Sequence, residues 1–149
     1  RDNWRNGISG AGSLVKEGTG KLELSGANSY NGGTTVKGGE IIATNDQSLG
    51  AGKVDLTGGE LVASAKDVKV KGSYNENKNS SLQVEAGDEV SISGKAKLGG
   101  TLSVAADHAK NNQVVLKYGS RSGKFNHVKI SGAHGLHLVY TNHEAVLIK

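Results

Sequence analysis

The chain has 149 residues, enough for one domain, with a formal net charge of +4 and 23 glycines but no proline, cysteine or methionine. Hydrophobic residues make up 35% and charged residues 21%, so the chain can bury a core and its glycines do not indicate disorder. The lack of cysteine excludes disulfides and thiolate metal sites, and no stretch approaches the roughly 18 apolar residues of a membrane-spanning helix. The basic residues are scattered and few aromatic residues accompany them, which argues against nucleic acid as a partner.

Short runs of alternating apolar and polar residues dominate the chain, and helix signals are nearly absent. Most of these runs end at Gly or at Ser-Gly, which is typical of strands closed by turns. The runs lie at 21–24, 35–37, 53–56, 67–70, 90–92 and 101–104. The sequence therefore predicts an all-β fold made of short strands.

One apolar position recurs at a nearly constant interval along these strands. Three segments repeat a Gly pair followed by an apolar residue: VKGGEIIA (36–43), LTGGELVA (56–63) and KLGGTLSVA (97–105). The apolar residues are Ile41, Leu61 and Leu102, and Leu22 and Leu82 extend the column, with spacings of 19, 20, 21 and 20 residues. Such a period predicts a β-solenoid whose coils stack equivalent residues. A β-sandwich is the alternative, but it gives no reason for the Gly pair to recur in register.

The regularity ends near residue 105, so we expect coils at 1–105 and a different segment at 106–149. After a polar stretch at 106–113, longer apolar runs follow, and the last two are separated only by TNHE, which indicates a hairpin. A solenoid end exposes apolar surface and an unpaired strand edge, both of which need a cap. We therefore expect 106–149 to form a β-hairpin cap within one continuous domain. The polar segment YNENKNSS (74–81) is expected to bulge as a loop from one coil.

Within residues 8–41, small, polar and apolar residues follow a fixed order. They are Gly18, Gly20, Leu22, Leu24, Ser25, Gly26, Asn28, Tyr30, Gly32 or Gly33, Thr35, Val36, Gly39 and Ile41. This order closely resembles the passenger-associated strand repeat of bacterial autotransporters, the type V secretion proteins, with its pattern G-x-G-x-L-x-L-S-G-x-N-x-Y-x-G-x-T-x-V-x-x-G-x-L. Residues 94–149 resemble the autochaperone or junction region that ends such passengers. Its expected cap residues here are Phe125, Leu138, Tyr140 and Leu147.

The resemblance implies a right-handed parallel β-helix in a passenger exported across the outer membrane of a Gram-negative bacterium. It also implies that the C-terminal part emerges first and nucleates folding outside the cell. The expected partners are the protein's own translocating outer-membrane β-barrel and an upstream passenger domain. This repeat style is common in autotransporters that carry a subtilisin-like serine protease ahead of the helix. The alternative function is that of an adhesin, whose coil face or loop at 74–81 contacts host glycans, matrix or cells.

No group of residues points to catalysis or to a cofactor. All five histidines follow residue 107, at His108, His127, His134, His137 and His143. His134 and His137 would point to opposite sides of a strand, with no carboxylate or thiolate beside them, so we expect no bound metal; zinc is the metal to test. The segment GSRSG (119–123) lacks the nucleophile-elbow pattern, and the aspartates are spread singly. We expect no enzymatic activity in this chain itself and no cofactor.

Overall fold

The structure is a computed structural model that describes residues 2–149; Arg1, the first residue of the predicted coil segment, lies outside the described residues. The described residues form sixteen strands and no helix, and so offer no helix that could cross a membrane. The strands are β1 (Asp2–Trp4), β2 (Leu14–Lys16), β3 (Lys21–Leu24), β4 (Thr34–Val36), β5 (Glu40–Ala43), β6 (Val54–Leu56), β7 (Glu60–Ala63), β8 (Asp67–Val70), β9 (Tyr74–Glu76), β10 (Ser81–Glu85), β11 (Glu89–Lys97), β12 (Thr101–Ala105), β13 (Gln113–Ser122), β14 (His127–Ser131), β15 (His137–Tyr140) and β16 (Glu144–Ile148).

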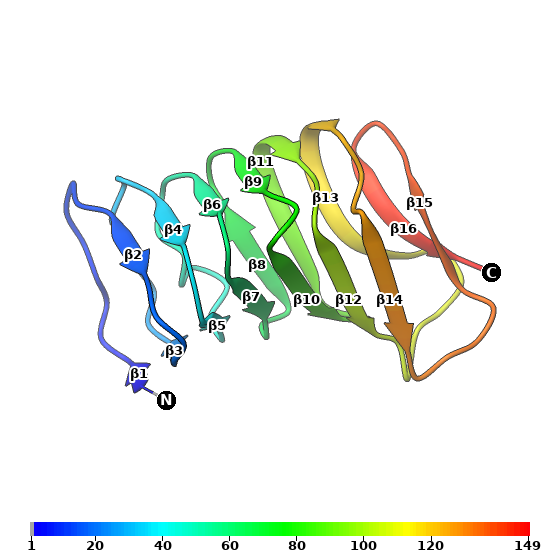
Figure 1. The fold of residues 1–149 in the computed structure, drawn as a ribbon, viewed down its shortest axis with the longest axis horizontal. Coiled ribbons are helices and arrows are strands. Elements are labelled where there is room, and N and C mark those ends of the chain that lie inside the picture. Colours follow the sequence, from blue (N-terminus) through cyan, green and yellow to red (C-terminus); the bar gives the residue numbers. More distant parts are fainter. Residues whose placement is uncertain (1) are drawn as a thin grey trace.

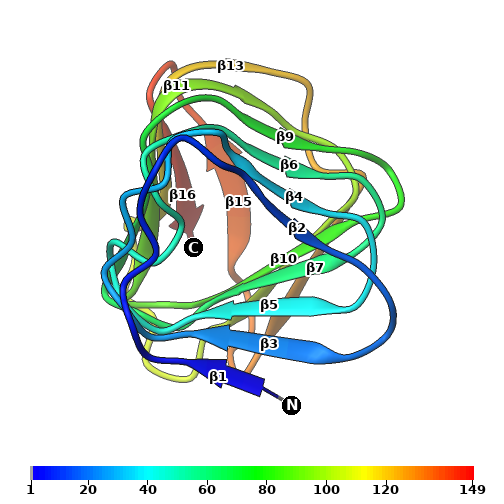
Figure 2. The ribbon, with the colours of Figure 1, turned by 90° about the vertical axis from the view of Figure 1, so that its left-hand side faces the viewer.

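The strands build two sheets that run along the length of the molecule (Figure 1). One sheet has the order β1-β3-β5-β7-β10-β12-β14, and the other has the order β15-β16-β13-β11-β9-β6-β4-β2, with β8 also paired to β11. Viewed along the long axis, the coils lie over one another around a common interior (Figure 2). Neighbouring coils pair in parallel, which confirms the predicted all-β solenoid with about 20 residues per coil.

The register of the seven-stranded sheet stacks one apolar column through the interior. Each residue faces the next in the order Leu22, Ile41, Leu61, Leu82 and Leu102. All five are buried, with exposed fractions between 0% and 7%. Burying a leucine or isoleucine side chain contributes about 1.5–3 kcal/mol, so this column is a main source of stability. A one-residue slip would turn it to solvent, which is why the register is well specified.

The prediction of a bulging loop at 74–81 is wrong. Tyr74–Glu76 is strand β9, in which Tyr74 faces Val54 and Glu76 faces Leu56 of β6. Only residues 77–80 turn, where the Asn77 side-chain oxygen accepts hydrogen bonds from the amide of Asn79 and the hydroxyl of Ser80. The prediction failed because it assumed that polar residues lie outside the sheet, whereas Tyr74 and Glu76 point inward and form a hydrogen bond with each other.

An antiparallel hairpin closes the C-terminal end of the solenoid. Strand β16 pairs antiparallel with both β13 and β15, so that Leu138 faces Leu147 and Tyr140 faces Ala145. Seen along the axis, β15 and β16 lie across the end of the interior (Figure 2). This confirms the predicted hairpin cap. Parallel stacking continues past residue 105, because β14 pairs with β12, and the division into 1–105 and 106–149 stays a prediction.

Candidate functional site

A buried asparagine of the repeat joins three consecutive coils. The Asn28 side chain is 5% exposed, and its Oδ1 accepts a hydrogen bond from the amide of Ile8 at 2.7 Å. Its Nδ2 donates to the carbonyl oxygen of Ser48 at 2.6 Å, and its backbone amide donates to Gln47. Ile8 and Ser48 each lie 20 residues away, one coil before and one coil after. One side chain therefore satisfies backbone groups of both neighbouring coils, which stabilises the stack.

The repeat tyrosine fits against a glycine of the next coil. Tyr30 is 2% exposed, and its hydroxyl shares a 2.6 Å hydrogen bond with the Thr34 hydroxyl. A Cβ atom at Gly50 would lie 2.9 Å from the Tyr30 ring, so a larger residue cannot stand there. Thr35, which belongs to the repeat pattern, lies half-buried between two inward residues of β4. Its neighbour Thr34, and not Thr35, makes the hydrogen bond with the Tyr30 hydroxyl.

The remaining repeat residues fall into three groups. Leu22, Leu24, Val36 and Ile41 belong to the core, together with Leu61, Leu82 and Leu102. Gly26 and Gly39 lie directly against the backbone of the preceding coil, and Gly33 lies beside Lys53 of the following one. Gly18 and Gly20 have open space around their Cα atoms. The structure thus brings Asn28 and Tyr30 into the contacts between coils through their side chains. Gly18 and Gly20 take part through their backbone, since the Gly20 carbonyl oxygen accepts a hydrogen bond from the Glu40 amide at 3.1 Å and the Gly18 carbonyl oxygen lies beside Gly38.

The core also contains a titratable pair that the sequence analysis missed, Tyr74 and Glu76. Glu76 is 2% exposed, and its Oε1 accepts a 2.7 Å hydrogen bond from the Tyr74 hydroxyl, while its Oε2 has no partner among the described residues. Burial raises the pKa of Glu76 to about 8, although the hydrogen bond from the Tyr74 hydroxyl acts in the opposite direction. Burial, and the neighbouring Glu76 charge, raise the pKa of Tyr74 well above its ordinary value. The signal was present, because Glu76 follows the inward Leu56 by 20 residues.

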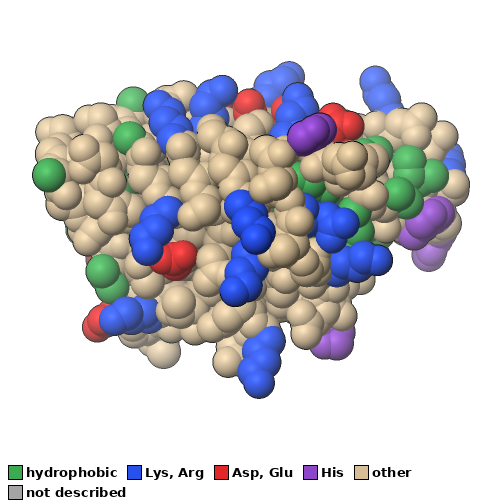
Figure 3. Space-filling model, turned by 90° about the horizontal axis from the view of Figure 1, so that it is seen from above, with side chains coloured by type: hydrophobic (Ala, Val, Ile, Leu, Met, Phe, Trp, Pro, Cys, Tyr) green, Lys and Arg blue, Asp and Glu red, His purple; other side chains and the backbone are tan. Residues whose placement is uncertain are grey.

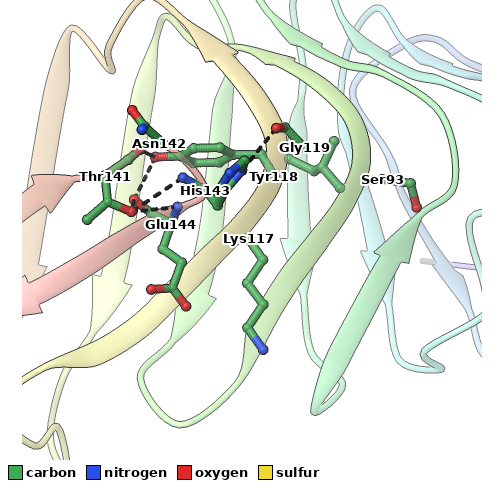
Figure 4. Close-up of a pocket in the computed structure, with 9 residues that line it drawn as sticks. Ser93, Lys117, Tyr118, Gly119, Thr141, Asn142, His143 and Glu144 are labelled. Carbon is green, nitrogen blue, oxygen red and sulfur yellow. Dashed lines mark hydrogen bonds between the residues drawn. The ribbon is translucent and has the colours of Figure 1, made fainter.

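A shallow depression of about 610 Å³ lies between β11, β13 and the turn of the hairpin (Figure 4). The Tyr118 hydroxyl donates to the carbonyl oxygens of Thr141 at 2.9 Å and Glu144 at 2.6 Å. His143 Nδ1 lies 3.0 Å from the carbonyl oxygen of Gly119. These bonds tie the turn between β15 and β16 to β13, so the polar groups here hold the cap in place.

The histidines form no metal-binding group with other residues. Within residues 2–149, no cluster of three or more His, Cys, Asp or Glu could hold a metal ion. His134 and His137 are exposed, on the loop before β15 and on β15. The absence of metal and of enzymatic activity therefore stays a prediction.

Three of the expected cap residues come together, and the fourth lies beneath them. The rings of Phe125 and Tyr140 are 6.5 Å apart, and the Phe125 amide donates to the Tyr140 hydroxyl at 3.1 Å. Leu138 lines the same surface, and its register partner Leu147 is fully buried. Arg121 lies over the Tyr140 ring, with its guanidinium carbon 4.7 Å from the centroid.

Comparisons with known proteins agree on one kind of relative. Residues 14–43, which include Asn28 and Tyr30, match the family model described as passenger-associated-transport-repeat. The chain is 37% identical over 89 residues to the adhesin BmaC autotransporter of Brucella suis biovar 1 (strain 1330), which covers 58% of this chain and 3% of that protein. It is 29% identical over 125 residues to the Neisserial autotransporter lipoprotein NalP of Neisseria meningitidis serogroup B, in strains MC58 and H44/76, covering 69% of this chain and 12% of that protein. The chain thus spans a small part of these relatives, and no solved structure matches it significantly.

Proposed function

This chain belongs to the passenger segments of autotransporters, and from that premise we propose that its C-terminal coils and hairpin act as an autochaperone that nucleates folding outside the cell. It is part of a passenger stem, exported across the outer membrane to the cell surface or the extracellular space. The proposed role adds that the stem's C-terminal end folds first and that the other coils then form on it.

The observation that supports this role most directly is the greater length of the strands next to the hairpin. Strands β11 and β13 have nine and ten residues, and Leu116, Ala145 and Leu147 around β13 are fully buried. In the interior coils before them, β4, β5, β6 and β7 have only three or four residues each. Longer strands pair more backbone groups and bury more apolar surface, which supports a more stable C-terminal end.

A stable end can direct the folding of the coils before it. Each coil contacts only its neighbours, so an ordered coil offers the next one a paired edge and an apolar face. The bonds of Asn28 to both neighbouring coils are an example of what a newly added coil gains. Folding of each emerging coil on this template would oppose its return through the membrane.

The wider assembly is also part of the proposal. The partners would be the protein's own translocating outer-membrane β-barrel and an upstream passenger domain. The repeat style of residues 8–41 favours a subtilisin-like serine protease as that domain. Sequencing the gene upstream of Arg1 tests this, because a protease requires an Asp, His and Ser set in subtilisin-like context.

A surface-display assay on cells that express the full parent protein tests the autochaperone role. Deleting residues 114–149, which removes β13 to β16, should reduce the amount of folded, protease-resistant passenger at the surface by about tenfold or more. The matched control deletes residues 2–20, which removes β1 and β2, and should leave display near its normal level. Normal display without residues 114–149 would refute the role.

A second candidate function is adhesion, which the 37% identity to a protein named as an adhesin favours. The contacting surface would be a coil face, since residues 74–76 belong to the sheet and cannot act as a protruding loop. A glycan array and a host-cell binding assay with this chain test it. Binding that persists in the 114–149 deletion would assign adhesion to the coils.

A further inference from the structure

An apolar groove lies at the C-terminal end of the solenoid, between β14 and β15. Its volume is about 320 Å³, and its apolar lining is Phe125, Val128, Ile130, Leu136, Leu138 and Tyr140. Figure 3 shows apolar side chains gathered at this end of the molecule, beside histidine, lysine and arginine side chains. The hairpin therefore covers the end of the interior incompletely.

Both strands that border the groove are edge strands. Among the described strands, β14 pairs only with β12 and ends the seven-stranded sheet, and β15 pairs only with β16 and ends the nine-stranded sheet. Val128 faces Leu102 and continues the inward column, yet it is 37% exposed, because no further strand lies over it. An edge strand with unpaired backbone groups beside an apolar strip is what an added strand requires.

The charge around the groove is of one sign. Two cations lie over the Tyr140 ring that lines the groove, with the Arg121 guanidinium carbon 4.7 Å and the Lys124 Nζ 5.7 Å from its centroid. Lys124 lines the groove, and Lys129 lies exposed on the outer face of β14. Of the nearby carboxyl groups, Asp107 lies beside Gly132 beyond the end of β14 and Glu76 is buried, so neither lines the groove. The groove thus favours an acidic ligand.

We propose that this groove binds an extended acidic segment of a partner protein, which adds as a further strand along β14. Alternate residues of the segment are apolar and lie over Val128 and Ile130, where they complete the inward columns. The residues between them carry carboxylates, which lie on the outer face beside His127 and Lys129. This activity goes beyond the stem and folding roles, and neither of them requires it.

Fluorescence anisotropy with a labelled eight-residue peptide of alternating Val and Glu tests the proposal. The chain should bind this peptide at least about tenfold more tightly than a Val and Lys peptide of the same length. A Val and Glu peptide with alternate N-methylated amides should bind about tenfold more weakly, because it cannot pair with the strand edge.

Two valines provide a matched pair of variants. Val128→Glu places a charge in the groove and should weaken binding about tenfold. Val139→Glu adds the same charge at a residue of equal exposure, 38% against 37%, that does not line the groove, and it should leave binding unchanged. Lys129→Glu, at an exposed site, should also weaken binding of the Val and Glu peptide. It replaces Val128→Glu as the test if circular dichroism shows that Val128→Glu does not fold.

The proposal is overturned if the Val and Glu peptide does not bind at about 1 mM, or if the Val and Lys or N-methylated peptide binds equally well. Equal loss of binding in Val128→Glu and Val139→Glu also contradicts it. Binding to phosphatidylglycerol vesicles in the absence of peptide binding would show that the basic end recognises a membrane surface instead.

Discussion

Replacing Glu76 by glutamine should remove most of the pH dependence of stability that this buried carboxyl group confers. In the folded chain its pKa is about 8, against an ordinary value of 4.5, so the folded state holds a proton that the unfolded state releases between these values. Because the folded pKa is raised, the stabilising contribution is fully present below about pH 4.5 and is lost as the pH rises toward 8. The unfolding free energy should fall by about 1.4 kcal/mol per pH unit within that window.

The magnitude follows from the two pKa values. Between pH 5 and pH 7 the wild-type chain should lose about 2.5 kcal/mol of stability through Glu76 alone. Glu76→Gln cannot ionise, and its side-chain oxygen can still accept the bond from the Tyr74 hydroxyl. Burying the amide costs about 1–3 kcal/mol if its nitrogen stays unpaired, so the absolute stability at one pH is the weaker test.

Urea unfolding monitored by circular dichroism at about pH 5 and about pH 7 measures the effect. The quantity to compare is the change in unfolding free energy between the two pH values, because Asp88, whose pKa is also raised, chiefly by burial, is present in every variant. Glu17→Gln, at an exposed position whose carboxylate pairs with the exposed Lys37, is the matched control and should keep the wild-type change. If Glu76→Gln loses as much stability as the wild type over this range, Glu76 does not hold its proton in the folded state.

Two further substitutions test the contacts described above. Asn28→Ala should lower the unfolding free energy by about 2–4 kcal/mol, because it leaves the partly buried amide of Ile8 and the buried carbonyl of Ser48 unpaired. Asn75→Ala on the outward face of β9 is the control, and equal effects of the two variants in urea unfolding would contradict the reasoning. Tyr118→Phe removes the two hydrogen bonds to Thr141 and Glu144 and should destabilise the cap by about 1–3 kcal/mol. Relative to the wild type, amide exchange should become faster at 141–148 and change little at 41–43. A uniform change along the chain would mean that the turn is held by other contacts.

The stacked column could be predicted from the sequence because the coils differ little in length. Spacings of 19 to 21 residues keep Leu22, Ile41, Leu61, Leu82 and Leu102 identifiable as equivalents. Strand pairing then follows from one rule, that equivalent residues stack. The hairpin could also be predicted from the sequence, since only four residues separate two apolar runs near the C-terminus.

The polar contacts could not be predicted in the same way. Composition assigned Tyr74 and Glu76 to a loop, because a glutamate seldom lies in a core and the hydrogen bond that makes it tolerable is visible only in three dimensions. Glu76 follows the buried Leu56 by 20 residues, which is one period, and therefore occupies an inward position. The period thus predicts the orientation of Glu76 better than its polar character does. Asn28 was recognised as a repeat residue, but its partners are backbone groups, which carry no sequence signal.

The glycines of this fold have a second role besides forming turns, because several make room for a large side chain of the preceding coil. A Cβ atom at Gly50 would lie 2.9 Å from the Tyr30 ring, and one at Gly100 would lie 2.8 Å from Glu76 Oε2. Both glycines also lie against the backbone of the preceding coil: the same Cβ atom at Gly50 would lie 2.6 Å from the Tyr30 carbonyl oxygen, and the one at Gly100 would overlap the Ser80 carbonyl oxygen. A side chain at either position would therefore collide with the preceding coil itself as well as with its large inward group, and steric overlap is costlier than the loss of a favourable contact. For a chain that folds by adding coils to a template, these glycines allow the close approach of neighbouring coils on which the burial of the leucine column depends.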